Sequence, residues 1–267
     1  MLGKPIAIFF STARDAIARG LLRLHVTPNK LTFAGMVLTL GVGACYAIGA
    51  GQTFAWDLDP HATSGSYLLL AAALLILASA CDMLDGAVAR IGNLSTQFGA
   101  FLDSTLDRYS DFVIYAGIAL YYASREEPNV TAIALSMMGF FNGFMISYSR
   151  ARAEDIIEKC SVGYWQRGER SAAVLIATFA HNIPALVVQQ AILPLFTVIR
   201  RMAHTHLVLS GKTPIADVRE GGFWMKIRLW RYPRMSWAYD VVTGANILWL
   251  IFVRFEIPDV LGDLLRG

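Results

Sequence analysis

The sequence predicts an all-α integral membrane protein. It has six transmembrane helices, an amphipathic juxtamembrane helix before them and an interfacial C-terminal extension after them. Three observations predict this class. Of the 267 residues, 55% are hydrophobic, and the mean hydropathy is +0.48. Charged residues make up 16%, compared with about 25% in a typical soluble domain. Several stretches without Asp, Glu, Lys or Arg are longer than the roughly 20 residues that a helix needs to cross a bilayer.

The composition also argues against other classes of protein. The apolar excess is untypical of a soluble globular enzyme, a disordered chain or a fibrous repeat. The net charge of +3 is too small to indicate binding to nucleic acid. The three cysteines, Cys45, Cys81 and Cys160, are odd in number and far apart. They indicate neither a disulfide framework nor a cysteine-based metal site.

The first predicted element is a helix in residues 5–24 that lies on the membrane surface. Apolar residues such as Phe9 and Leu21 are mixed there with basic residues such as Arg14 and Arg19. A helix with one apolar face and one basic face is typical of the membrane–water interface.

The six spans follow from the stretches that lack charge. Four such stretches run over residues 31–56, 60–81, 128–149 and 171–199. The last contains Asn182-Ile183-Pro184, and proline fits the first turn of a helix but not its interior, so we expect two helices to meet there. A further helix is expected at 95–123, which is apolar apart from three acids and one arginine. The predicted spans are 29–50, 65–91, 95–123, 128–155, 166–182 and 184–206.

Basic residues predict the orientation of these spans. Lys and Arg are concentrated before the first span, between the fourth and fifth spans and after the sixth, whereas the loop 52–65 is acidic, with Asp57 and Asp59. Both ends of a membrane domain at 1–206 should therefore face the cytoplasm. The C-terminal extension, 207–267, contains an apolar stretch at 241–253 that is short for a span. We expect it to be interfacial; a re-entrant segment and a seventh crossing are the alternatives.

Five aspartates lie inside the second and third predicted spans, where ionisable residues are costly and usually functional. Asp82 and Asp85 end the second span, Asp103 and Asp107 begin the third, and Asp111 follows one turn deeper. Spacings of three and four residues place side chains on one face of a helix. Four carboxylates that converge at one surface need cations to neutralise them, and carboxylates favour hard divalent ions. The first four aspartates are therefore predicted to hold two Mg²⁺ or Mn²⁺ ions, a pair suited to phosphoryl transfer.

Three further residues fit a phosphate ligand beside these acids. Gly86 and Gly99 let a ligand approach the helix backbone, and Arg90 offers a guanidinium group that suits phosphate oxygens. The alternative is that the acids only pair with Arg90 and Arg108 at the helix ends. Asp111 is interpreted as structural, or as paired with a basic residue, rather than as a metal ligand.

At these residues the chain resembles the CDP-alcohol phosphatidyltransferase family. The family pattern is D-x2-D-G-x2-A-R, then about eight residues, then G-x3-D-x3-D. The positions that match it are Asp82, Asp85, Gly86, Ala89, Arg90, Gly99, Asp103 and Asp107. The resemblance covers roughly residues 1–206. It implies a membrane enzyme of phospholipid biosynthesis, usually a homodimer, that transfers a phosphatidyl group from a CDP-activated lipid such as CDP-diacylglycerol to an alcohol and releases CMP.

The resemblance also implies roles for individual residues. Asp82, Asp85 and Asp103 would bind the metals, and Asp107 would contribute to the metal site and take the proton of the acceptor hydroxyl. The residues implied for CDP binding are Asn29, Asp82, Gly86, Ala89, Arg90 and Gly99. The tripeptide Thr27-Pro28-Asn29 is similar to the family as well, although on its own it is a helix-start signal.

A second group of basic residues concerns the acceptor alcohol. Arg150 lies in Ser147-Tyr148-Ser149-Arg150-Ala151-Arg152-Ala153-Glu154, Arg167 opens Arg167-Gly168-Glu169-Arg170, and Arg200-Arg201 ends the sixth span. Several guanidinium groups at one surface suggest an acceptor that carries a phosphate, although the positive-inside rule also requires basic residues there. The runs resemble the bacterial phosphatidylinositol phosphate synthase branch of the family, with Arg150 at a position usually held by lysine. This resemblance implies that the protein lies in the cell (inner) membrane of a prokaryote, with its active site facing the cytoplasm. The resemblance implies inositol 1-phosphate as acceptor, with its phosphate bound by Arg150, Arg167 and one of Arg200 or Arg201, of which we select Arg201.

Three other functions stay open at this point. Glycerol 3-phosphate is the leading alternative acceptor, which would make the protein a phosphatidylglycerophosphate synthase. A membrane prenyltransferase also holds Mg²⁺ through aspartates, but it separates its two acidic motifs across distant helices. A transporter that uses membrane acids for coupling is not supported by an inverted repeat or by paired broken helices.

Overall fold

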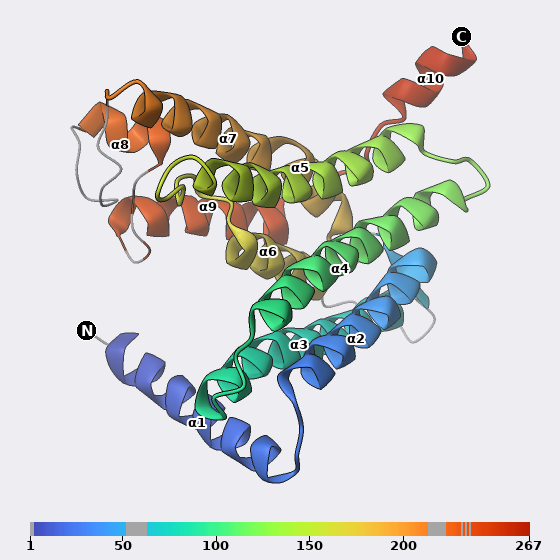
Figure 1. The fold of residues 1–267 in the computed structure, drawn as a ribbon. Coiled ribbons are helices and arrows are strands. Elements are labelled where there is room, and N and C mark those ends of the chain that lie inside the picture. Colours follow the sequence, from blue (N-terminus) through green and yellow to red (C-terminus); the bar gives the residue numbers. More distant parts are fainter. Residues whose placement is uncertain (1–2, 52–62, 213–222, 231, 233, 235) are drawn as a thin grey trace.

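A computed structural model describes residues 3–51, 63–212, 223–230, 232, 234 and 236–267. The described residues form helices and no strand, which confirms the all-α class (Figure 1). The helices are α1 (Gly3–Arg23), α2 (Pro28–Gly49), α3 (Thr63–Ile91), α4 (Gln97–Ala123), α5 (Val130–Glu154), α6 (Arg167–Phe179), α7 (Ile183–Leu209), α8 (Phe223–Leu229), α9 (Trp237–Phe252) and α10 (Val260–Arg266). The acidic loop residues Asp57 and Asp59 lie outside the described residues.

Each of the six predicted spans coincides with one helix, from α2 to α7. Four of these helices, α2, α3, α5 and α7, are long and apolar enough to cross a membrane within the described part of the chain. Helix α4 has 27 residues but carries the three aspartates and Arg108. Helix α6 has 13 residues, or about 20 Å at 1.5 Å per residue. The count of six spans therefore stays a prediction for α4 and α6.

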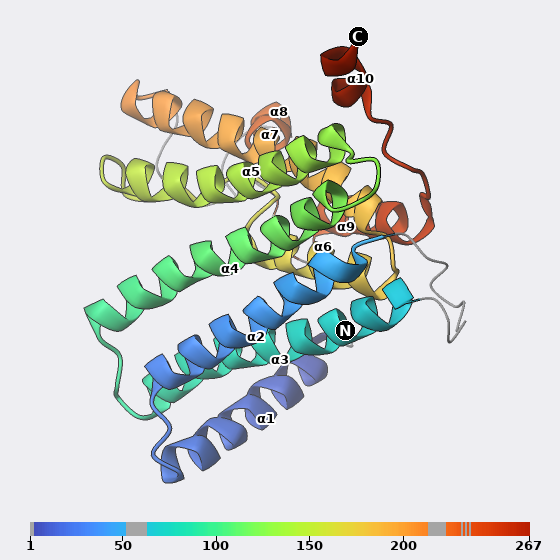
Figure 2. The same cartoon turned by 90° about the vertical axis from the view of Figure 1, so that its right-hand side faces the viewer.

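The helices pack in two groups that face one another (Figure 2). Helix α2 packs against α3 and α4, α5 packs against α7, and α4 joins the groups by also packing on α5. Helix α6 lies against α3, α7 and α9. Helix α1 packs on α3 through the buried Ala18, which meets Ala87 and Val88. The predicted location of α1 on the membrane surface stays a prediction.

Two glycines bring α2 and α4 into backbone contact. A Cβ atom at Gly117 would overlap the backbone of Gly43, and a Cβ atom at Gly43 would lie 2.8 Å from the carbonyl oxygen of Val113. Small residues allow such close helix crossings in membrane proteins. Helix α2 is also tied to α6 by a 2.5 Å hydrogen bond between the Tyr46 and Thr178 hydroxyl groups. These contacts fix α2, α4 and α6, which all contribute to the site below.

The ends of the helices gather on two faces of the bundle. The acid face is the end that holds Asp82, Asp85 and Asp103, where α3 ends and where α2, α4 and α6 begin. The opposite face is the end that holds Gly51 and Asn129, where α2 and α4 end and where α5 and α7 begin. Helices α5 and α7 end on the acid face, so the predicted basic residues Arg150 and Arg201 lie there with the acids.

Candidate functional site

A tight turn brings the acids of α3 and α4 together. Helix α3 ends at Ile91, and Asn93 adopts a left-handed conformation with φ 51°, which asparagine tolerates better than most residues. Thr96 then caps α4, since its hydroxyl group accepts a 2.9 Å hydrogen bond from the Gly99 N–H group. The last turns of α3 are thus placed directly beside the first turns of α4.

Three of the four predicted metal ligands form one cluster. Asp82, Asp85 and Asp103 each offer a carboxylate oxygen, and these oxygens lie within 4.8 Å of one another. Asp85 is buried, and one of its oxygens accepts a 2.9 Å hydrogen bond from the Thr32 hydroxyl group of α2. The Oδ1 atom of Asp103 is buried without a hydrogen-bond partner among the described residues. Converging carboxylate oxygens with an unpaired buried acceptor fit a hard divalent cation.

Asp107 lies one turn further along α4 and is held differently. It forms an ion pair with Arg167 of α6, and the Arg108 guanidinium lies 3.7 Å from its other oxygen. Arg167 also lies 3.0 Å from Asp82. The structure thus brings Asp82, Asp85 and Asp103 together and places Asp107 beside them, against a guanidinium group. Its role as a fourth metal ligand stays a prediction.

All four aspartates line one cavity of about 280 Å³ between α2, α3, α4 and α6. Asp111 lines its inner part and lies 3.5 Å from Arg170, whose side chain is buried. Arg108 lies 4.0 Å from Asp111 on the same helix. Asp111 is therefore paired with basic residues, as predicted.

The residues predicted to bind the nucleotide lie around the same turn. The Oδ1 atom of Asn29 is 3.6 Å from the position that a Cβ atom would take at Gly99. The Arg90 guanidinium lies over Gly86, 3.3 Å from the corresponding position there. Ala89 is half-buried and Arg90 is exposed. The structure therefore brings Asn29 next to Gly99 and Arg90 next to Gly86, on the acid face; their contact with a nucleotide stays a prediction.

A second cavity, of about 540 Å³, opens beside the acids on the same face. It is lined by all three arginines predicted to bind the acceptor phosphate, Arg150, Arg167 and Arg201. Asp107 and Arg167 line both cavities, so the two spaces meet at this ion pair. A group bound by the arginines would therefore lie next to the Asp107 carboxylate.

The structure separates the two adjacent arginines that end the sixth predicted span. Arg201 is buried and donates to the carbonyl oxygens of Ile146 and Val162 beside the second cavity. Arg200 points elsewhere, with its guanidinium 5.6 Å from the centre of the Trp230 ring. Of these two arginines, Arg201 is therefore the one that lines the cavity; its contact with an acceptor phosphate stays a prediction.

Three residues at the site were not predicted from the sequence. Thr32 orients Asp85, Arg170 lines both cavities, and Arg234 lines the second cavity from the C-terminal extension. Arg234 lies 2.9 Å from Glu169, the third residue of the predicted Arg167–Arg170 run. Arg170 could have been found from that run, because it follows Arg167 by three residues on one helix face. Arg234 carries no such signal, since only the folding of the extension brings it to the site.

Comparison with known proteins identifies similar chains. Residues 25–208 match the family model described as CDP-alcohol phosphatidyltransferase. An archaetidylinositol phosphate synthase of Methanothermobacter thermautotrophicus is 33% identical over 188 residues, which cover 68% of this chain and 84% of that protein. A phosphatidylinositol phosphate synthase of Corynebacterium glutamicum is 30% identical over 208 residues, which cover 76% of this chain and 85% of that protein.

Solved structures show the same relationship. The phosphatidylinositol phosphate synthase of Mycobacterium tuberculosis with bound CDP-DAG has a TM-score of 0.59 and 27% identity, covering 72% of this chain and 92% of that one. A crystal structure of the same protein in complex with manganese and citrate has a TM-score of 0.59 and 26% identity, covering 72% and 88%.

Proposed function

The chain belongs to the CDP-alcohol phosphatidyltransferase family, and on this premise we propose that it transfers the phosphatidyl group of CDP-diacylglycerol to a phosphorylated polyol. The favoured acceptor is inositol 1-phosphate, and the products are phosphatidylinositol phosphate and CMP. One observation carries the proposal: the cavity lined by the aspartates meets the cavity lined by the arginines at the Asp107–Arg167 ion pair.

The first cavity suits the diphosphate of the donor lipid. Asp82, Asp85 and Asp103 would hold divalent cations, and Asp107 would join them as a fourth ligand. Bound Mg²⁺ or Mn²⁺, two ions in the proposal, would neutralise the diphosphate and the charge that develops on the leaving group. The manganese-containing neighbour and the CDP-DAG-bound neighbour support this assignment. Asn29, Gly86, Ala89, Arg90 and Gly99, together with Asp82, would bind the CDP part.

In this proposal Asp107 acts as the base. Its carboxylate lines both cavities, so it can accept the proton of an acceptor hydroxyl group in the second cavity. The acceptor oxygen then attacks the phosphorus atom on the lipid side of the diphosphate. A new P–O bond forms to the acceptor, and the P–O bond to CMP breaks. Positioning and electrostatic stabilisation supply most of the catalysis in such transfers.

The second cavity suits an acceptor that carries its own phosphate. Arg150, Arg167 and Arg201 present positive charge around it, and a guanidinium group can donate two parallel hydrogen bonds to a phosphate. Two relatives that differ in their donor lipid, the archaetidyl and phosphatidyl synthases, are both named for an inositol phosphate product. This supports inositol 1-phosphate over glycerol 3-phosphate.

Assembly and location complete the proposal. We propose a homodimer in the inner membrane of a prokaryote, with the acid face toward the cytoplasm, where CDP-lipid and polyol phosphate would meet. The concentration of Lys and Arg on the acid face supports this orientation.

A competition assay tests the proposal. Purified protein in detergent receives CDP-diacylglycerol, Mn²⁺ or Mg²⁺ and an equimolar mixture of inositol 1-phosphate, glycerol 3-phosphate, free inositol and glycerol. Mass spectrometry of the lipid products, with CMP release measured in parallel, should show phosphatidylinositol phosphate as the main product. If phosphatidylglycerophosphate is the main product, the acceptor is glycerol 3-phosphate and not inositol 1-phosphate. If no CMP is released with any acceptor, the proposal as a whole is contradicted.

A further inference from the structure

Helix α9, in the C-terminal extension, runs beside α6 from the acid face to the opposite face (Figure 1). Near its start, the Tyr239 hydroxyl group donates a 2.7 Å hydrogen bond to Glu169 in the first turn of α6. Near its end, the side-chain amide of Asn182, which follows α6, donates to the carbonyl oxygens of Leu250 and Val253, both at 2.8 Å. Since both ends of α9 meet the corresponding ends of α6, the two helices are parallel and cover the same depth.

One side of α9 is bound to the bundle by polar contacts. The Tyr164 hydroxyl group donates to the Thr243 hydroxyl oxygen at 3.0 Å, and the Gln189 side-chain amide donates to the Asn246 side-chain oxygen at 3.0 Å. Leu250 on this side is fully buried. Interhelical hydrogen bonds between such side chains commonly hold helices together within a bilayer.

The other side of α9 is an exposed apolar stripe. Trp237, Val241, Leu248 and Phe252 are 73%, 62%, 57% and 70% exposed. Their spacings of four, seven and four residues place them on one face of the helix. Asp240, in the first turn, is the single charged residue of α9. A contiguous apolar stripe of this kind indicates contact with lipid or a partner, and the neighbouring helix α7, which is long and apolar enough to cross a membrane, favours lipid.

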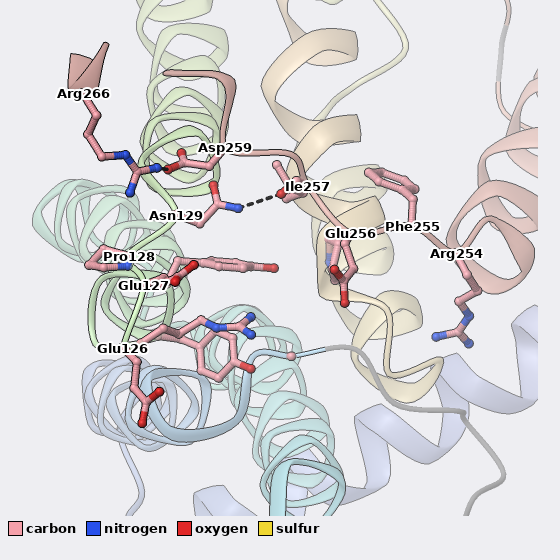
Figure 3. A pocket seen from close by; sticks show the side chains of 15 residues that line it. Glu126, Glu127, Pro128, Asn129, Arg254, Phe255, Glu256, Ile257, Asp259 and Arg266 are labelled. Carbon is pink, nitrogen blue, oxygen red and sulfur yellow. Dashed lines mark hydrogen bonds and ion pairs between the residues drawn. The ribbon is translucent and has the colours of Figure 1, made fainter. Parts of the chain in front are cut away.

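The chain beyond α9 is fixed to the opposite face (Figure 3). The Asn129 side-chain amide donates a 2.6 Å hydrogen bond to the Ile257 carbonyl oxygen. The Thr131 N–H group donates to Asp259 at 2.9 Å, and this hydrogen bond is the main cause that holds the pKa of the Asp259 carboxyl group below its ordinary value. The segment also lines a cavity of about 1030 Å³ together with Gly51 and Arg125. Residues 254–266 therefore lie on the same face as Gly51, which follows α2, and as the loop between α4 and α5.

The charges on either side of α9 follow the positive-inside rule. Residues 210–236 contain six Lys and Arg, whereas residues 253–267 contain two. Short loops rich in Lys and Arg stay on the cytoplasmic side. The basic segment before α9 begins at the end of α7, on the acid face. The distribution of charge and the contacts of α9 therefore agree that α9 begins on the acid face and ends on the opposite face.

We infer that α9 crosses the membrane as an additional span with its apolar stripe against lipid, so that residues 254–267 lie on the side opposite to the acid cluster. This differs from the interfacial location expected from the 241–253 stretch. In the structure the helix that contains this stretch begins earlier, at Trp237. It has 16 residues and is therefore about 24 Å long. A span of this length is accommodated by local thinning of the bilayer.

Single cysteines on the full-length chain test the inference. Asp263→Cys lies in the exposed segment after α9, and Lys212→Cys lies on the acid face after α7. Spheroplasts that express each variant are treated with a membrane-impermeant maleimide before and after permeabilisation, and the unsubstituted chain gives the background from its own three cysteines. We expect the two introduced thiols to react from opposite sides of the membrane, with Asp263→Cys labelled in intact spheroplasts. Labelling of both from the same side would overturn the inference.

Reporter fusions at Gly267 of the full chain give a second measurement. Alkaline phosphatase is active only outside the cytoplasm, and green fluorescent protein fluoresces there poorly. An active phosphatase with a dark fluorescent protein supports the crossing, and the reverse pattern overturns it. Neither measurement depends on catalysis, so this test can fail while the proposed transferase function holds.

Discussion

Arg167 at the start of α6 forms an ion pair with Asp107 of α4, and the pair lies where the two cavities of the acid face meet. The same guanidinium group reaches Asp82 in the acid cluster, at 3.0 Å. One arginine therefore connects the proposed donor site to the proposed acceptor site.

Replacement of Asp85 by asparagine should abolish turnover. The change keeps the size of the side chain and the partner hydroxyl group of Thr32, but it removes one negative charge from the cluster. We expect Asp85→Asn to lower CMP release by about 10³-fold or more. Asp155→Asn is the matched control, because Asp155 is exposed and pairs with Arg152 outside both cavities. Full activity of a folded Asp85→Asn variant would contradict the metal assignment.

Removal of divalent cations should be visible without an activity assay. A ligand that binds only the folded protein raises the unfolding temperature by mass action. Mn²⁺ added after chelation should therefore raise the melting temperature of the wild-type protein in detergent. The increase should be lost in Asp103→Asn, because Asp103 contributes one of the three converging carboxylates. An equal increase in both proteins would place the ion elsewhere.

Asp107→Asn should impair the chemical step more than binding. If Asp107 takes the acceptor proton, its loss should lower kcat by about 10²- to 10⁴-fold. The affinity for CDP, measured by calorimetry with Mn²⁺ present, should fall much less in Asp107→Asn than in Asp85→Asn. A variant that loses CDP binding and activity to the same degree would indicate that Asp107 is mainly a metal ligand.

Arg234→Gln should weaken acceptor binding selectively. Arg234 lines the second cavity from the extension, and its side chain is 63% exposed, so we expect the KM for inositol 1-phosphate to rise several-fold. The KM for CDP-diacylglycerol should stay unchanged. The Arg234→Lys variant, which keeps the positive charge, should retain most of the wild-type affinity for inositol 1-phosphate. Arg152→Gln is the control, since Arg152 pairs with Asp155 and does not line the cavity. If both KM values rise together, Arg234 acts through the fold rather than through the acceptor.

Gly117→Ala should destabilise the bundle. Its Cβ atom would overlap the Gly43 backbone, so α2 and α4 would have to move apart, at a cost of about 1–3 kcal/mol. Thermal unfolding in detergent should show a lower melting temperature. Gly20→Ala in α1 provides the control, because a Cβ atom there meets nothing within 4 Å. An unchanged melting temperature for Gly117→Ala would show that the crossing can relax.

Much of the helical arrangement could be predicted from charge-free stretches, because lipid leaves the backbone few alternatives to helix. The acid cluster could be predicted as well: spacings of three and four residues and a five-residue turn leave Asp82, Asp85 and Asp103 little freedom to separate. The two adjacent arginines Arg200 and Arg201 could not be told apart from the sequence; the structure places Arg201 at the second cavity and the Arg200 guanidinium group over the Trp230 ring.

The tertiary contacts of the C-terminal extension could not be predicted from local sequence patterns. Arg234 reaches Glu169 across 65 residues of sequence, and no periodicity links them. The sequence allows only the length of the apolar stretch at 241–253 to be compared with the thickness of a bilayer. In the structure, α9 is also held by hydrogen bonds to α6, α7 and Asn182 between them. Tertiary contacts of this kind allow a helix too short for an independent span to be held at that depth.

The direction of α9 has a consequence for how the gene product can be joined to other domains. If α9 crosses the membrane in addition to the six predicted spans, Met1 and Gly267 would lie in different compartments. A soluble enzyme fused ahead of Met1 would share the aqueous phase of the catalytic cavities and could hand over a water-soluble substrate directly. The same enzyme fused after Gly267 would be separated from those cavities by the bilayer, and could act only on molecules that reach the far leaflet.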